Sequence, residues 1–123
     1  MKTDVEILDK FGQIVTRDVH DELFYFISSD LGVLAQSEGV MNLFANMSQI
    51  QKKELESYID GLLTDSIFQF LKIFDENSQF KLIFEDEDGR VKDLNKISDM
   101  LKAEPLIENG WIQRFSKYKR VNK

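Results

Sequence analysis

Apolar and charged residues follow one another with a helical period through the first thirty residues of the chain. The apolar positions recur at spacings of three, four and one, at Leu8, Phe11, Val15, Val19, Leu23, Phe26 and Ile27. This spacing predicts an amphipathic helix over about 5–30. It is expected to end at Gly32, where the missing Cβ permits a left-handed C-cap. Gly12 costs a helix up to ~1 kcal/mol relative to Ala, so the regular part is expected to begin after it.

The same period predicts two further helices, over about 40–47 and 48–75. Ser48 has the sequence signature of an N-cap, with Gln51 at the third helical position as the partner in a capping box. The second half of the longer helix is apolar around most of its circumference, which requires burial on more than one side. We therefore expect this to be the central helix, with Phe70, Leu71 and Phe74 largely buried.

After Asn77 the period changes to that of a strand. Phe80, Leu82 and Phe84 alternate with more polar neighbours, and apolar residues return after a polar turn that ends in Gly89. This alternation predicts a β-hairpin over about 79–94 with a loop of four or five residues.

The last thirty residues predict one or two short helices. Asn95 is expected to cap one that Pro105 prevents from continuing, and a second is expected around 111–118. The predicted fold class is therefore α+β, mostly helical, with three helices, one hairpin and these short C-terminal helices in a single domain, 1–123.

Composition fits one ordinary folded domain. The 123 residues are 42% apolar and include ten Phe, which suffices for one core. The sequence has no Cys, which excludes disulfides and thiolate metal sites and fits a reducing compartment. Residues 1–6 become acidic where a signal peptide needs an apolar stretch, and no run approaches the ~20 apolar residues of a membrane span. We expect a cytoplasmic protein that does not bind membranes.

Charge is divided unevenly along the sequence. Residues 1–110 carry all 22 acidic side chains against 11 basic ones, while residues 111–123 carry five basic and no acidic side chains. Basic residues next to aromatic ones are also found in nucleic-acid sites, but the acidic body would repel phosphate. We expect no direct nucleic-acid binding, and we expect the basic tail to dock on the acidic body of its own chain.

Catalytic and metal-binding patterns are weak. His20, the sole histidine, lies among carboxylates, but no Ser, Cys or second ligand follows at catalytic or metal spacing, so an exposed helical histidine is expected. Asp75, Asn77 and Gln79 match the start of a calcium loop, yet Phe80 stands where that loop needs Gly. The six Gly stand singly, without a phosphate-binding loop. The sequence predicts no catalytic residue, no metal site and no cofactor.

The four consecutive carboxylates Glu85, Asp86, Glu87 and Asp88 fall in the predicted hairpin loop. Like charges this close repel one another unless a cation or a basic partner is present. We therefore take these four residues as the candidate partner-binding site. The alternative interpretation is an ordinary solvated turn.

One stretch near the C-terminus resembles a known sequence pattern. The residues concerned are Glu108, Asn109, Gly110, Trp111, Ile112, Gln113, Arg114, Phe115, Ser116, Lys117 and Tyr118. They resemble the end of small uncharacterised bacterial helical proteins that carry an acidic-Gly-Trp-Ile and a Phe/Tyr-Ser-Lys-Tyr pattern, from which no activity follows. By type, a small, acidic, Cys-free, aromatic-rich chain is similar to the immunity proteins that neutralise nuclease toxins.

Together these observations favour a non-enzymatic acidic protein that binds a basic protein partner, such as a nuclease-type toxin. Complementary charge would speed association, and apolar anchors would supply most of the affinity. Two alternatives stay open. One is a small enzyme whose site uses carboxylates and His20, and the other is a structural or regulatory subunit that forms a homo-oligomer.

Overall fold

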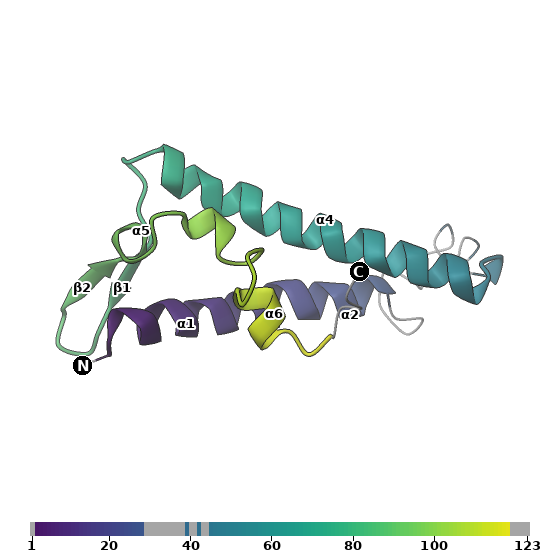
Figure 1. Ribbon diagram of the computed structural model, residues 1–123, viewed down its shortest axis with the longest axis horizontal. Coiled ribbons are helices and arrows are strands. Elements are labelled where there is room, and N and C mark those ends of the chain that lie inside the picture. Colours follow the sequence, from purple (N-terminus) through teal and green to yellow (C-terminus); the bar gives the residue numbers. More distant parts are fainter. Residues whose placement is uncertain (1, 29–38, 40–41, 43–44, 119–123) are drawn as a thin grey trace.

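The protein is built from two long helical rods and a shorter C-terminal segment (Figure 1). The structure is a computed structural model that describes residues 2–28, 39, 42 and 45–118. Its elements are α1 (Asp4–Val15), the π-helix η1 (Thr16–Asp21), α2 (Glu22–Ser28), α4 (Gln49–Glu76), β1 (Ile83–Glu85), β2 (Val91–Asp93), α5 (Leu94–Ile97), the 3-10 helix η3 (Leu101–Ala103) and α6 (Trp111–Phe115).

The N-terminal rod consists of α1, η1 and α2 without a break, and the second rod is α4. The C-terminal segment is the stretch that carries α5, η3 and α6. The N-terminal rod contacts α4 directly through α2 and η1, while α5 and α6 pack on α1 and η3 packs on α4. Figure 1 shows α5 and the stretch after it between the two rods where they diverge, and α6 against the N-terminal rod. The architecture is the mostly helical α+β arrangement that the sequence predicts, with one two-stranded antiparallel sheet among the described residues.

The N-terminal rod begins earlier than expected. The hydroxyl of Thr3 accepts a hydrogen bond from the Glu6 amide at 3.2 Å, and this N-cap starts the helix at Asp4. The expectation that regular helix begins after Gly12 is therefore wrong. Gly12 is buried against Trp111, and a Cβ at this position would lie 2.5 Å from the indole. The glycine is needed for this close approach. The predicted cap at Gly32 and half of the predicted helix 40–47 fall outside the described residues.

The capping box of α4 is confirmed. The Gln51 amide donates to the Ser48 hydroxyl at 3.1 Å, and the Ser48 amide donates to the Gln51 side chain at 2.9 Å. The burial prediction for this helix is only partly confirmed. Leu71 is 2% exposed and Phe74 half-buried, but Phe70 is 60% exposed. It was wrongly expected to be buried, because α4 is covered along one side only.

The hairpin follows the predicted position closely. Antiparallel pairing sets Ile83 opposite Asp93 and Glu85 opposite Val91, and residues 86–90 form a five-residue loop. Leu82 and Phe84 are half-buried against the core. Phe80, expected on the same buried face, is exposed because it precedes the paired part of the strand.

The short helices after the hairpin differ in detail from the prediction. Asp93, rather than Asn95, caps α5, because its side chain accepts from the Asn95 amide at 3.0 Å as the strand ends. The helix stops at Ser98, several residues before Pro105, and η3 follows as a separate turn.

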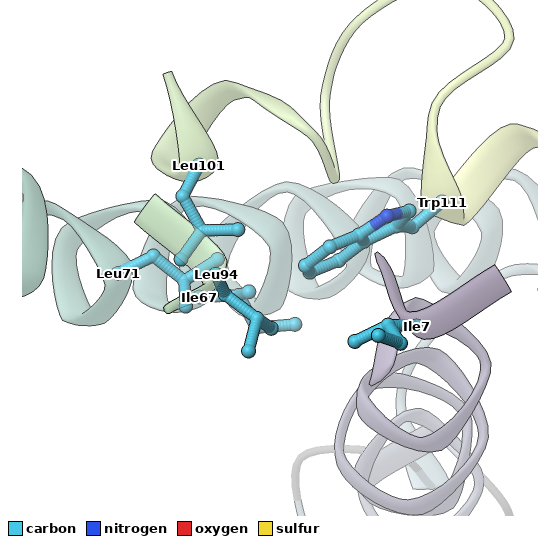
Figure 2. Close-up of a cluster of buried hydrophobic side chains, with 6 residues drawn as sticks. All are labelled: Ile7, Ile67, Leu71, Leu94, Leu101 and Trp111. Atoms are coloured by element: carbon cyan, nitrogen blue, oxygen red, sulfur yellow. The ribbon is translucent and has the colours of Figure 1, made fainter. Parts of the chain in front are cut away.

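The main core lies where the C-terminal segment meets both rods. Trp111 and Leu101 are fully buried, and the Phe11 ring meets the Trp111 ring edge-on at 5.6 Å. Figure 2 shows the six buried side chains of this cluster, which come from five elements: Ile7, Ile67, Leu71, Leu94, Leu101 and Trp111. Within the described residues, none of the helices combines the length and apolarity needed to cross a bilayer.

Candidate functional site

The acidic run singled out from the sequence forms the tip of the hairpin. Glu85 ends β1, and the following residues make the loop. One oxygen of Asp86 accepts hydrogen bonds from the amides of Asp88 and Arg90, both at 2.9 Å. Gly89 has a φ of +82°, which only glycine adopts without strain, and it completes the turn. Asp86 is thus part of the turn itself.

The remaining three carboxylates of the run differ in their surroundings. Asp88 lies 3.6 Å from the Arg90 guanidinium, on the surface. Glu85 and Glu87 are exposed, and within the part of the chain that the structure describes they form no ion pair. The run therefore presents two carboxylates to solvent that the fold does not use, rather than four equivalent ones.

Apolar side chains lie next to these carboxylates on the outer face of the hairpin. Ile83 is 48% exposed and Val91 is 59% exposed, and Val91 is the cross-strand partner of Glu85. A surface pocket of about 390 Å³ adjoins this face, lined by Asp4, Lys81, Ile83, Val91, Lys92, Asp93, Lys96 and Ile97. The hairpin thus combines exposed apolar groups with carboxylates at its tip and lysines at its base.

A second polar cluster surrounds His20 and was not predicted. The side chain is only 1% exposed, so the expectation of an exposed histidine is wrong. Its Nδ1 lies 2.7 Å from Asp21, and its Nε2 lies 2.5 Å from Asp60 of α4. The Phe24 ring stacks parallel to the imidazole with centroids 6.2 Å apart. Both ring nitrogens therefore face carboxylates.

Asp21 extends this cluster to the C-terminal segment. One of its oxygens accepts from the Ser116 hydroxyl at 2.6 Å, and the other accepts from the Lys117 amide at 2.9 Å. Arg114 contacts Asp9 of α1 at 3.0 Å. The described part of the basic tail is therefore docked on the acidic body, as the sequence predicts.

The pKa of His20 is set by two opposing effects. Burial by itself lowers the pKa of the imidazole, because it penalises the charged form. The hydrogen bonds to Asp60 and Asp21, together with the negative charge of both groups, outweigh burial and raise the pKa above its ordinary value of 6.5. The two carboxylates therefore favour the imidazolium form of the ring.

This geometry favours holding the fold together over reacting. The Ser116 hydroxyl donates to Asp21 and not to His20, so the imidazole is not placed to take its proton. Among the described residues, no group of three or more His, Asp or Glu is arranged to hold a metal ion. The Asp75 carboxylate, considered for calcium, accepts from the Asn95 side chain at 2.7 Å and from the Lys102 amide at 2.9 Å.

The π-helix explains why His20 was missed. A π-turn has hydrogen bonds from residue i to i+5, so it shifts the phase of the helix by one residue. Val19 and Leu23, assigned to the buried face, are consequently exposed, while His20 and Asp21 turn inward. One signal was available in α4, where Asp60 shares the inward face with Ile67 and Leu71. A carboxylate at such a position needs a buried donor.

Comparison with protein-family models, curated proteins and solved structures gave no match in any of the three.

Proposed function

We propose that this protein is a non-enzymatic acidic binding protein that neutralises a basic protein partner of the nuclease-toxin type. Its body carries an excess of carboxylates, and Arg114 is paired with Asp9 of the same chain. Such a charge distribution steers a basic partner toward the protein and disfavours acidic ones.

The observation that carries this proposal is the construction of the hairpin tip. Asp86 fixes the turn through two amides, so Glu85 at the end of β1 and Glu87 in the loop are held at an ordered hairpin tip. An ordered loop loses little conformational entropy when a partner binds. Its carboxylates are accordingly suited to meet lysine or arginine side chains.

The apolar residues beside the tip supply what charge alone does not. Interfaces draw most of their affinity from a few apolar or aromatic anchors surrounded by a polar rim. Ile83 and Val91 are exposed on the same hairpin as Glu85 and Glu87. In the proposed complex these two side chains form the anchor and the carboxylates form the rim.

The experiment measures association kinetics with an identified partner. A basic protein encoded next to this gene, or one captured by the immobilised chain and then purified, is titrated against the wild type and the variant Glu85→Gln/Glu87→Gln. Association should slow in the variant, mainly at low salt, where screening lengths are ~10 Å or more. Asp86 is left intact so that the turn is preserved.

The matched control removes the same charge elsewhere. Glu54→Gln/Asp65→Asn neutralises two exposed carboxylates of α4 and should change the association rate much less. The proposal fails if the partner's association rate is insensitive to the hairpin variant and to salt from ~10 to 500 mM.

A second candidate is a homo-oligomeric subunit, favoured by the outer side of α4. Tyr58, Leu62 and Phe70 are spaced by multiples of four and are all exposed, which places them near one face of the helix. If a second copy covers them, sedimentation equilibrium should show a concentration-dependent mass that Tyr58→Ala/Leu62→Ala abolishes. A monomer at all concentrations would exclude this candidate.

A further inference from the structure

His20 lies where three separate parts of the chain meet. It belongs to the N-terminal rod, its Nε2 reaches Asp60 of α4, and its Nδ1 reaches Asp21. Asp21 in turn holds the Ser116 hydroxyl and the Lys117 amide of the C-terminal segment. His20 and Asp60 lie 40 positions apart in the sequence, and Asp21 and Lys117 lie 96 positions apart. The buried ring of His20 therefore joins distant segments, directly through Asp60 and indirectly through Asp21.

The number of protons on this ring decides whether both contacts are favourable. An imidazolium donates from both nitrogens, whereas a neutral imidazole donates from one and accepts at the other. A carboxylate only accepts. Since both nitrogens of His20 face carboxylate oxygens at 2.7 and 2.5 Å, only the imidazolium satisfies both. In the neutral form one nitrogen lone pair would face a carboxylate.

We propose that His20 is a proton-operated latch that joins the N-terminal rod to α4 and opens when the ring loses its proton. The device goes beyond the proposed binding function and does not depend on it. It is a regulated joint within the fold, closed while the ring carries two protons and released when one of them is lost.

The structure also indicates which contact opens. Asp21 is buried and receives the Ser116 and Lys117 hydrogen bonds in addition to that of His20, so it is fixed in place. The side chain of Asp60 is 21% exposed and can turn toward water. The remaining proton of a neutral ring therefore stays at Nδ1, facing Asp21, and the contact to Asp60 is released. The C-terminal segment remains attached to the rod while α4 separates locally.

Other charged groups lie on the surrounding elements. One turn before Asp60, α4 carries the half-buried Glu56. On the rod itself Glu22 is exposed. Among the described cations of the neighbouring elements, Arg17 contacts Asp18 at 2.8 Å, Arg114 contacts Asp9 at 3.0 Å, and the Lys117 ammonium lies 5.3 Å from the Tyr118 ring.

The direction of the pH effect follows from the raised pKa of His20. A group whose pKa is higher in the folded protein contributes stability that is complete below its ordinary value, here 6.5. That contribution is lost as the pH rises through the folded-state pKa. The latch is accordingly closed on the acidic side of this transition and open on the alkaline side.

The sole histidine allows a direct test by NMR. The imidazole Cε1 proton of the full chain gives one signal, which is followed from about pH 5 to pH 10. Its midpoint should lie above 6.5 in the wild type. In Asp60→Asn it should shift downward, because the amide carries no charge and its NH₂ group can donate to the neutral ring. The control Asp65→Asn makes the same change at an exposed site of α4 and should leave the midpoint unchanged.

Amide hydrogen exchange tests the opening itself. Corrected for intrinsic rates, protection over 56–64 of α4 should fall across the histidine transition, while protection over 67–74 stays constant. In His20→Gln, which has no titrating ring, protection over 56–64 should not change with pH in this range. A wild-type midpoint at or below 6.5 would overturn the latch, whether or not the variants fold. Unchanged protection over 56–64 across the transition would also overturn it.

Discussion

Two parts of the N-terminal rod, α1 and η1, are held by different forces. In α1, Ile7 and Phe11 pack around Trp111, and Gly12 lets the indole approach the backbone. In η1, the buried groups are polar, and His20 is bonded to two carboxylates. The same short C-terminal segment contacts both parts.

This difference separates shape from protonation as sources of stability. Apolar packing depends on volume and is insensitive to pH over the range in which its side chains do not titrate. A buried charged cluster depends on a proton and on the completeness of its partners, and removing one partner leaves the others uncompensated. Substitutions in these two parts should therefore have similar costs but different pH dependences.

The largest effect is expected for Trp111→Ala. Emptying this site should cost about 3 to 5 kcal/mol of the free energy of unfolding, because a large buried ring leaves a cavity. Urea unfolding at about pH 6 and pH 9 should give the same loss. Trp111→Phe should cost less, since it keeps an aromatic ring and removes the indole N–H, which has no hydrogen-bond partner among the described residues. A loss of under about 1 kcal/mol for Trp111→Ala would contradict the assignment of this core.

The next largest effect is expected for His20→Ala, at about 3 kcal/mol below pH 6.5, since Asp21 and Asp60 lose the cation between them. The raised pKa of His20 means that the wild type loses this contribution as the pH rises through the folded-state value. The difference between variant and wild type should therefore shrink on the alkaline side. If urea unfolding gives the same difference in free energy between the variant and the wild type at about pH 6 and pH 9, the ring acts through packing alone.

Two Gly→Ala substitutions, one in α1 against Trp111 and one in α4, sharpen the role of shape. A Cβ at Gly12 would lie 2.5 Å from the Trp111 indole, so Gly12→Ala should cost about 1 to 3 kcal/mol. A Cβ at Gly61 of α4 would meet nothing within 4 Å, so Gly61→Ala should stabilise by about 0.4 to 1 kcal/mol. Thermal unfolding measures both, and a neutral Gly12→Ala would show that the indole can move.

The smallest effect is expected where charge is exposed. Glu85→Gln/Glu87→Gln should change the free energy of unfolding by no more than about 0.5 kcal/mol, because solvent screens these carboxylates. Asp86→Ala should cost about 1 kcal/mol, because it removes the acceptor of two loop amides. A large loss in the double variant, measured by urea unfolding, would place the hairpin tip among the structural charges with Asp21.

Local signals in the sequence account for most of the elements. The capping box of Ser48 and Gln51 predicts the start of α4, and the alternation around Leu82 and Phe84 predicts the hairpin. Thr3 is likewise a local N-cap residue for α1, and Gly12 does not delay the start of the helix. Such elements depend on residues within one or two turns of each other, which a pattern can display.

Contacts between distant segments could not be predicted from the sequence pattern, for a physical reason. The π-turn at Thr16–Asp21 changes which residues face inward, and nothing in its composition distinguishes it from α-helix. Phe70 and Leu71 are neighbours of similar apolarity, and only the elements that pack on one side of α4 decide that Leu71 is covered and Phe70 is not.

The sequence by itself determined the helical and hairpin periods, the capping box of α4 and the uneven charge of body and tail. The tertiary structure decided that His20 is buried between Asp21 and Asp60, and that only Glu85 and Glu87 of the acidic run remain outside the contacts of the turn. Periodicity records which faces of an element are apolar, because local geometry repeats along the chain. It does not record which distant group supplies a proton or an amide, because that depends on how the folded elements are placed.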